Sequence, residues 1–554
     1  MTFDSAPDSE DPMHMHARDP DVRWTIANVG EALIGVHPPL TVTYAMDGAE
    51  ISGLMMWRDN GVVSADEVRL DNDPDQRMTA VFFGRFCLNL KKTADIVTRL
   101  PGVDVERMEE GLTGEAKAGA SAAEKQPRPG LKDIPAYARL LVVGASATPR
   151  LRRRLQALEP WWRNAVGGRR ELGAAQRLFR ESYDKYVDVL RFGLHASMLG
   201  PRIFSEVVNL AEAKGMTGLE NELFTGLGMP EEKVAEDLWE ASRGRLPVSA
   251  IIDRHGYQAP RQFDFIADSW RTRADIIDPL IEALARVPED QNPHAKHVTQ
   301  VAARQRAEQR LRAASNYVER IKLRVMLPLA AHFLRQREAQ KVGCLMALDG
   351  ARAASREIAG HLVAQGSLSD PSDIAFLTLA EACSDGLPSD IKDLVGSRRA
   401  KYEQYLTLDL PESWVGPPVP ISNAESTERA SADRVSGFPV TPGVVEGRAV
   451  VVTDPDDAFD VEPGDILVCR STDPSWTPVM MIAGALVIDV GGPMSHGAIV
   501  ARELGVPCVT NTKSGTRQIQ TGNRVRVDGT SGEVTVIGAS HHEVPIPAQQ
   551  EDEA

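Results

Sequence analysis

One segment near the C-terminus predicts a strand, a turn and a helix within about twenty residues. Residues 485–490 (ALVIDV) have the pattern of a buried strand, and the glycine pair at 491–492 is typical of a turn. Residues 496–504 then place apolar side chains on one helical face. Ser495 can cap that helix, because its side-chain oxygen accepts a hydrogen bond from a free backbone N–H. His496 is therefore expected in the first helical turn.

This position favours a bound anion. The first turn of a helix leaves backbone N–H groups free, and the helix dipole is positive there. The preceding glycines, Gly491 and Gly492, let the backbone approach a phosphate closely. A lone histidine more often serves only as a hydrogen-bonding loop residue. The surroundings of His496 instead suit a histidine that accepts a phosphoryl group and passes it on.

The same segment resembles a known signature. Residues 491–507 (GGPMSHGAIVARELGVP) resemble the phosphohistidine signature of enzymes that use or make phosphoenolpyruvate (PEP), and rifampin phosphotransferases carry a similar element. The resemblance starts at residues 438–449 (FPVTPGVVEGRA) and continues to residues 528–534 (DGTSGEV). It implies a small β/β/α swivelling domain in which His496 is the catalytic, phosphorylated residue. The family usually has alanine where this chain has Gly497.

The signature also supplies candidates for holding the phosphoryl group. Ser495 is either a helix cap, which we favour, or a hydroxyl that helps to hold the phosphate. Thr472 lies in a loop that the family places near the histidine, and it is either a phosphate contact or a turn former. Arg502 is about 600° around the helix from His496, so we expect it to serve docking or a surface ion pair. The phosphate-binding candidates are Gly492, Ser495, Gly497, Thr472 and Arg502.

Composition divides the chain into five parts. Residues 1–21 are polar and acidic and are predicted to be a disordered tail, whereas residues 22–414 are predicted to form a large, mainly α-helical substrate-binding domain. Residues 415–436 predict a flexible linker with a root-mean-square reach on the order of 25 Å. Residues 437–540 are predicted to form the swivelling domain, and residues 541–554 a polar tail. The predicted fold class is multidomain α+β.

Periodicity predicts individual elements within these parts. Spacings of three and four residues between apolar side chains predict helices, and short β-rich runs between glycine-rich turns predict strands. Residues 109–135, rich in Ala, Gly, Lys and Glu, are expected to form a surface excursion. The predicted helices include residues 176–199 and 303–362, and the predicted strands include residues 450–452, 466–468, 487–488 and 525–527.

The predicted helical domain, residues 22–414, also resembles known proteins through four short motifs, which occur in the same order along the chain. They are WTIANVGEAL (24–33), GRFCLNL (84–90), RHGY (254–257) and LSDPSDIAFL (368–377). Together they resemble the middle, substrate-binding domain of rifampin-phosphotransferase-like and PEP-synthase-like proteins. Within it, His255 and Tyr257 are the main candidates for binding the acceptor, and His195 is a weaker one. His255 is either a general base for an acceptor hydroxyl or a core histidine with a hydrogen-bond partner.

A charged group in the same part is expected to be structural. Arg335, Arg337 and Glu338 have the spacing of ion pairs on one helix face, and an anion-binding role for them is the alternative.

Family members that act alone carry an N-terminal ATP-grasp module, and PEP-converting members carry a PEP-binding barrel. This sequence shows neither, nor a GxxxxGK[ST] loop. The resemblance therefore implies a split, dikinase-type phosphotransferase, like phenylphosphate synthase and the aryl phosphate synthases. A separate ATP-grasp subunit would bind ATP and Mg²⁺, and His496 would pass a phosphoryl group to a small hydroxyl compound such as a phenol. The alternatives are a pyruvate, water dikinase-like component and a non-catalytic phosphohistidine carrier or regulatory protein.

Charge and cysteine content exclude other classes. The formal net charge of −16 argues against a general nucleic-acid binder. The five cysteines are scattered without a CxxC pair, so we expect neither structural zinc nor disulfides, no metal ligands, and a cytoplasmic location. The N-terminus lacks the apolar core of a signal peptide. The longest apolar stretch, residues 479–490, is too short and interrupted to span a membrane.

Overall fold

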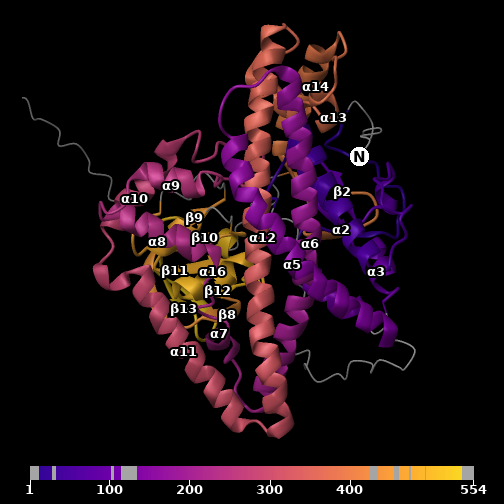
Figure 1. Ribbon diagram of the computed structural model, residues 1–554. Helices are drawn as coiled ribbons and strands as arrows, with labels where there is room; N and C mark the ends of the chain where they lie inside the picture. Colours follow the sequence, from indigo (N-terminus) through magenta and orange to yellow (C-terminus); the bar gives the residue numbers. More distant parts are fainter. Residues whose placement is uncertain are drawn as a thin grey trace, which may run out of the picture.

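Three long helices form the centre of the protein (Figure 1). They are α5 (Ile134–Ala165), α6 (Leu172–Ala213) and α12 (Tyr317–Ala364), and α2 (Asp47–Asp59) packs against α6. The computed structural model describes residues 11–27, 33–100, 105–113, 134–422, 434–453, 461–472, 476–492 and 495–538.

The central helices bury both aromatic and charged side chains. Tyr44 stacks on Phe179 of α6, with ring centroids 5.7 Å apart. Asp349 of α12 is fully buried, and it accepts hydrogen bonds from the Trp162 indole at 2.9 Å and from two nitrogens of Arg271 at 3.0 and 3.1 Å. Because a buried carboxylate is stable only when paired, Asp349 ties α12 to α5 and to the loop that carries Arg271.

A small sheet lies beside the central helices. Its strand order is β2-β3-β1-β5, with Trp24 of β1 opposite Trp414 of β5. Met13 and Met15 pack into the adjoining cores with 0% and 5% of their surface exposed. The prediction of a disordered tail over residues 1–21 is therefore wrong for residues 11–21, and residues 1–10 lie outside the described residues. The strands are β1 (Arg23–Thr25), β2 (Thr79–Phe82), β3 (Arg85–Asn89) and β5 (Ser413–Val415).

Shorter helices complete the N-terminal part. We call α7 to α11 the outer helices. The predicted helix at 303–362 is broken at Asn316, which caps α12 by accepting from the N–H of Glu319 at 2.9 Å. The late segment at 371–376 is a 3₁₀ helix, and residues 114–133 of the predicted surface excursion lie outside the described residues. The remaining α-helices are α1 (Pro39–Thr41), α3 (Leu90–Val97), α4 (Val105–Thr113), α7 (Glu220–Leu223), α8 (Pro230–Ser242), α9 (Val248–His255), α10 (Asp278–Ala285), α11 (Pro293–Ala314), α13 (Leu379–Ala382) and α14 (Ile391–Leu406).

The C-terminal domain is built on an eight-stranded sheet of order β7-β14-β13-β9-β10-β11-β12-β8. Strands β9 to β12 are parallel, and antiparallel strands flank them on both sides. All four predicted strands are confirmed. The elements are β7 (Arg434–Ser436), β8 (Phe438–Thr441), β9 (Val444–Val452), β10 (Ile466–Cys469), α15 (Thr477–Ile482), β11 (Ala485–Ile488), α16 (His496–Leu504), β12 (Cys508–Thr510), α17 (Gly515–Gln518), β13 (Arg524–Asp528) and β14 (Glu533–Gly538).

Both ends of the predicted linker 415–436 are structured. Val415 ends β5, β6 (Ile421–Ser422) pairs back with β4 (Leu408–Asp409), and β7 already belongs to the C-terminal sheet. The predicted domain start at residue 437 therefore moves to Arg434. Residues 423–433 and the predicted polar tail 541–554 lie outside the described residues.

The C-terminal domain lies between the outer helices and the central helices (Figure 1). One apolar core runs through both, because Trp239 and Leu280 of the outer helices pack in the same cluster as Leu467 and Val479. Ile499 of α16 packs in a second cluster with residues of α11 and α12. The domain is thus held by an apolar interface on two sides.

Among the helices that the structure describes, none is both long and apolar enough to cross a membrane.

Replacing Asp349 by alanine should destabilise the central helices. It leaves the Trp162 indole and the Arg271 guanidinium without their buried acceptor, at an expected cost of about 3 kcal/mol. Asp268→Ala is the matched control, because Asp268 pairs with Arg356 at 3.3 Å on the surface and should cost less than about 1 kcal/mol. Urea unfolding of the full chain measures both, and equal destabilisation would contradict the role given to Asp349.

Candidate active site

Helix α16 begins at the predicted histidine. Ser495 is its N-cap, and its hydroxyl oxygen accepts from the N–H of Ala498 at 3.4 Å. Gly505 ends the helix with a φ of 64°, a left-handed conformation that suits glycine. The predicted cap at Ser495 and the predicted helix start at His496 are both confirmed.

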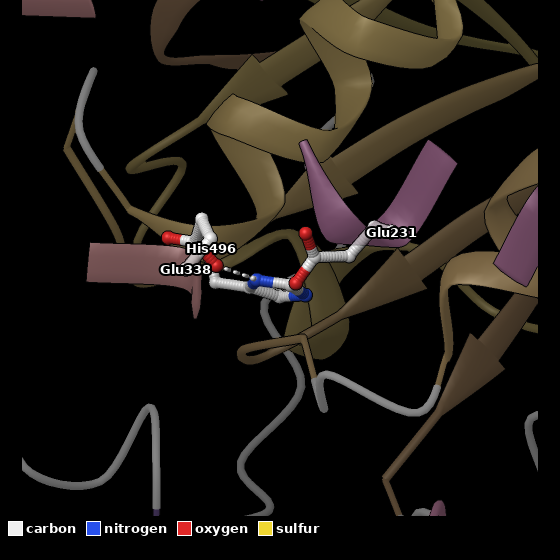
Figure 2. A group of neighbouring side chains, drawn as sticks. All are labelled: Glu231, Glu338 and His496. Atoms are coloured by element: carbon white, nitrogen blue, oxygen red, sulfur yellow. Dashed lines mark ion pairs between the residues drawn. The ribbon is translucent and has the colours of Figure 1, made fainter. Parts of the chain in front are cut away.

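His496 faces a charged group on the helical part of the chain. Its Nδ1 lies 3.1 Å from Nζ of Lys341 and 3.9 Å from a carboxylate oxygen of Glu338, both on α12. Lys341 also pairs with Glu338 at 3.1 Å and with Glu231 of α8 at 2.7 Å. The two carboxylates converge on the imidazole (Figure 2). His496 is 7% exposed, and its Nε2 has no hydrogen-bond partner among the described residues.

Burial and charge set the protonation of this group. Burial lowers the pKa of His496, and the charge of Lys341 lowers it further against the pull of the carboxylates. Burial alone would lower the pKa of Lys341, but Glu231 and Glu338 raise it above its ordinary value. Burial would raise the pKa of Glu338, yet Lys341, His496 and Arg337 hold it well below the usual range. A neutral imidazole therefore lies against an ammonium flanked by carboxylates.

The same atoms bear on metal binding. The acceptor atoms of Glu231, Glu338 and His496 all lie within 4.8 Å of one another, close enough to share a cation. The Lys341 ammonium contacts all three of them. Because the ammonium already supplies the positive charge, this arrangement does not fit Mg²⁺ unless Lys341 is displaced.

Two of the phosphate-binding candidates pack against each other beneath the histidine. A Cβ added at Gly497 would lie 2.9 Å from Oγ1 of Thr472 and 2.6 Å from Cδ1 of Ile488. This chain therefore needs glycine where the family usually has alanine. Gly492 lies before the helix with open space around it. Thr472 is buried at the foot of α16, so the loop near the histidine lies where the resemblance implied.

Arg502 belongs to a different surface. Its Nε donates to the Asn221 side chain at 3.2 Å, and its carbonyl oxygen accepts from Thr225 at 2.9 Å and from Gln300 at 2.7 Å. It lies about 9 Å along the helix from His496. These contacts favour the docking interpretation and argue against a phosphate contact.

The predicted acceptor residues lie apart from the imidazole, and none of them hydrogen-bonds to His496. Nε2 of His255 lies 2.9 Å from Asp237, and His255 is 6% exposed. Tyr257 packs edge-on against Trp162, and burial raises its pKa, with Glu231 contributing. These contacts favour the structural interpretation of His255, whereas Tyr257 borders the charged group through Glu231.

His195 is also structural. It is 2% exposed on α6, where Nδ1 lies 3.4 Å from the Asn60 amide and Nε2 lies 3.8 Å from Asp59. Asp59 in turn pairs with Arg191. This group fastens α6 to the end of α2 and contains no carrier residue.

Sequence reasoning missed Lys341 and Glu231, and it assigned Glu338 only to a helix-face ion pair. Glu338 does lie 3.7 Å from Arg337, as expected, but it also faces His496. The only sequence signal was the spacing of Glu338 and Lys341, three residues apart on one helix. That spacing places both on one face without saying that another domain covers it.

A cavity of about 200 Å³ lies between the small sheet and the C-terminal domain. Ser471 and Val490 line it from loops that follow β10 and β11, and Ile26, Arg85 and Phe86 line it from the other side. Parallel strands collect their carboxyl ends at one edge of a sheet, and the loop that leads to His496 leaves β11 at that edge. The cavity therefore opens on the same edge as the histidine.

Two parts of the chain match known families. Residues 461–532, which include His496, match the mobile domain of PEP-utilising enzymes. Residues 222–338, which include Glu231 and Glu338, match the fourth domain of rifampicin phosphotransferase. The matched segments thus meet at the histidine, and they confirm the resemblance to PEP-utilising enzymes and the multidomain α+β fold.

Curated relatives match a larger part of the chain. An uncharacterised protein of Mycobacterium tuberculosis (strain H37Rv) is 30% identical over 58% of this chain and 34% of its own length. Rifampicin phosphotransferases of Streptomyces sviceus and Bacillus subtilis (strain 168) are each 29% identical, over 56% and 53% of this chain and 37% and 35% of their own lengths. The chain therefore spans about a third of the length of these relatives.

Gly497→Ala should destabilise the C-terminal domain by about 1–3 kcal/mol, because the new methyl group overlaps Ile488 and Thr472. Gly492→Ala is the control, since a Cβ there meets nothing within 4 Å. Thermal unfolding of the two variants tests this prediction. An unchanged midpoint for Gly497→Ala would show that the domain relaxes around the alanine that its family prefers.

Proposed function

We propose that this chain is the phosphohistidine subunit of an ATP-dependent, dikinase-type phosphotransferase. His496 accepts a phosphoryl group from ATP bound on a separate ATP-grasp subunit and transfers it to the hydroxyl of a small organic acceptor such as a phenol. The contact between His496 and Lys341 carries this proposal. One domain holds the nucleophile, and the other presents a cation to it when the two are docked.

The free nitrogen identifies the reacting atom. Nδ1 of His496 is engaged by Lys341, whereas Nε2 has no partner among the described residues. Because Lys341 donates to Nδ1, the phosphoryl group is assigned to Nε2: a ring phosphorylated at Nε2 keeps the Nδ1 lone pair that accepts this hydrogen bond. The lowered pKa of His496 keeps the ring neutral near pH 7, which is the form that attacks phosphorus.

Delivery breaks the bond between phosphorus and Nε2 and forms a bond between phosphorus and the acceptor oxygen. The electron pair of the broken bond stays on Nε2. The proton that Lys341 donates toward Nδ1 moves onto the ring, so the ring leaves as neutral imidazole, and the acceptor's hydroxyl proton restores the ammonium. The remaining contribution is position and charge, as expected for phosphoryl transfer. Over the full cycle, ATP, water and the acceptor give AMP, inorganic phosphate and the phosphorylated acceptor.

The cavity beside the small sheet supports a small acceptor. Its volume of about 200 Å³ suits a compact organic molecule, and its walls combine apolar side chains with Arg85, Arg470 and Asp409. A mostly apolar site with a few polar groups holds a ring and orients its hydroxyl.

The donor side is assigned to a partner. ATP and Mg²⁺ are the cofactors that PEP-utilising enzymes generally use, and in the group around His496 the Lys341 ammonium already lies where a cation would bind. The matched relatives are roughly three times as long as the segment they share with this chain, which leaves room in them for a donor module. Here an ATP-grasp subunit supplies that module.

His496→Ala should abolish both labelling and turnover. With the ATP-grasp partner and labelled ATP, the unmodified chain should acquire an acid-labile, base-stable phosphohistidine at Nε2. His195→Asn is the control and should keep the label, because His195 lies against α2. Undiminished labelling of His496→Ala would contradict the assignment of His496 as the phosphorylated residue.

Lys341→Met should separate the two half-reactions. Lys341 contacts His496 in the docked arrangement, so loading from ATP should stay near the unmodified rate. Discharge to the acceptor should slow by about 10²-fold, as when one charge-stabilising donor is removed. Rapid-quench measurement of phosphohistidine follows each step, with the exposed Lys322→Met as control and Lys341→Arg as partial rescue. Equal loss of loading and discharge would show that Lys341 is only structural.

A further inference from the structure

A second group of titratable side chains joins the two domains at the other end of α16. Glu503 is 5% exposed, and its two carboxyl oxygens accept from the N–H of Leu227 at 3.1 and 3.2 Å. Leu227 lies in the segment between α7 and α8. Glu503 is thus a carrier side chain bound into the outer helices, seven residues beyond His496.

Glu232 of α8 meets Glu503 there. It caps its own helix, accepting from the N–H groups of Gly228 at 3.1 Å and Met229 at 3.3 Å. Its other oxygen lies 2.8 Å from Nδ1 of His297 on α11. Acceptor atoms of Glu232, His297 and Glu503 all lie within 4.8 Å of one another. Helices α8, α11 and α16 lie close together (Figure 1). They meet at two carboxyl groups and an imidazole.

A buried carboxylate beside a second, partly buried carboxylate is costly to ionise. Burial raises the pKa of Glu503 well above its ordinary value, and the hydrogen bond and charge of Glu232 raise it further. Arg304 opposes this effect, but its guanidinium is committed to the carbonyl oxygens of Thr225 and Gly226. One shared proton between the two carboxyl groups satisfies the geometry.

Few other charges reach this group. Helices α10 and α15 contribute apolar side chains, Leu284 and Met481, to the adjoining cavity. Glu231 is committed to Lys341, and Arg502 to Asn221. The charged or titratable side chains that face the group are Glu236 of α8 and Lys296, His297 and Arg304 of α11.

We propose that Glu503 is a positioning residue that docks α16 beside Lys341 by sharing one proton with Glu232, so that docking takes up a proton. Undocking separates the two carboxyl groups, since they belong to different domains. Glu503 then regains water and ionises at neutral pH. Acid conditions favour the docked arrangement, and alkaline conditions release it. The consequence for phosphoryl delivery rests on the proposed function, whereas the docking itself does not.

The direction follows from the raised pKa. A carboxyl group whose pKa is higher when docked strengthens docking most below its ordinary value of about 4.3. That contribution is lost as pH rises toward the raised value. Between the two values the docking equilibrium constant should fall by up to tenfold per pH unit, because one proton is released.

Fluorescence transfer within the full chain tests this without any activity. Lys322→Cys on α12 and Arg526→Cys on β13 give exposed labelling sites, whereas the five native cysteines are buried. The docked fraction should fall as pH rises from about 5.5 to 8.5. Glu503→Gln keeps the hydrogen bonds without ionising, so it should stay docked across this range. Glu232→Gln should weaken the pH dependence without removing it, because burial alone still raises the pKa of Glu503. Glu446→Gln, at an exposed position of β9, should leave the pH dependence unchanged.

Three outcomes would overturn the proposal. One is a docked fraction of the unmodified chain that does not vary with pH. Another is the same pH slope in Glu503→Gln and Glu232→Gln as in the unmodified chain. A third is release of the docked domain by EDTA with recovery on adding Zn²⁺, which would show a metal ion in place of the proton. None of these depends on whether His496 is phosphorylated, so failure here is distinct from failure of the proposed function.

Discussion

The Lys341 ammonium lies where α8, α12 and α16 meet. Two of its partners, Glu231 and Glu338, come from the helical part of the chain, so the ion group is complete before the C-terminal domain docks. His496 then adds a neutral ring to a charged group that is already fixed. Such preorganisation matters because a buried charge is costly when its partners must be assembled during the reaction. The group holds one positive and two negative charges, so an unphosphorylated imidazole fits it better than a phosphorylated one. In the proposed function, discharge of the phosphoryl group would therefore leave the docked arrangement more stable than before.

Local chemistry made the carrier segment predictable. A strand, a glycine turn, a serine cap and an amphipathic helix lie within about twenty consecutive residues, and each follows from short-range rules. Lys341 and His496 are separated by 155 positions in the chain, and no periodicity encodes their meeting. The same limit explains His255 and His195. A sequence shows the imidazole, but it does not show the buried carboxylate beside it that makes the residue structural.

The predicted domain boundaries were wrong for a related reason. Residues 11–21 and 415–436 have polar or proline-rich compositions that suggest irregular chain. Met13 and Met15 nevertheless reach apolar clusters, and the linker ends are paired with strands distant in sequence. Composition indicates how a segment would behave alone, whereas residues 11–21 and the two described ends of 415–436 are ordered by contacts with other parts of the chain. The periodic strands were found correctly, and so were the helices apart from the break at Asn316.

The apolar clusters shared by the outer helices and the C-terminal domain have a consequence for any movement of the domain that contains His496. Trp239 and Leu280 of the outer helices pack in one cluster with Val479, and Ile499 packs in a second cluster with α11 and α12. Undocking would expose an apolar face on the C-terminal domain and another on the helices that it had covered. A long-lived undocked state would therefore promote aggregation. The proposed ATP-grasp partner should therefore present an apolar docking surface similar to that of the outer helices. The two docking sites would then have similar apolar surfaces, although they belong to different proteins.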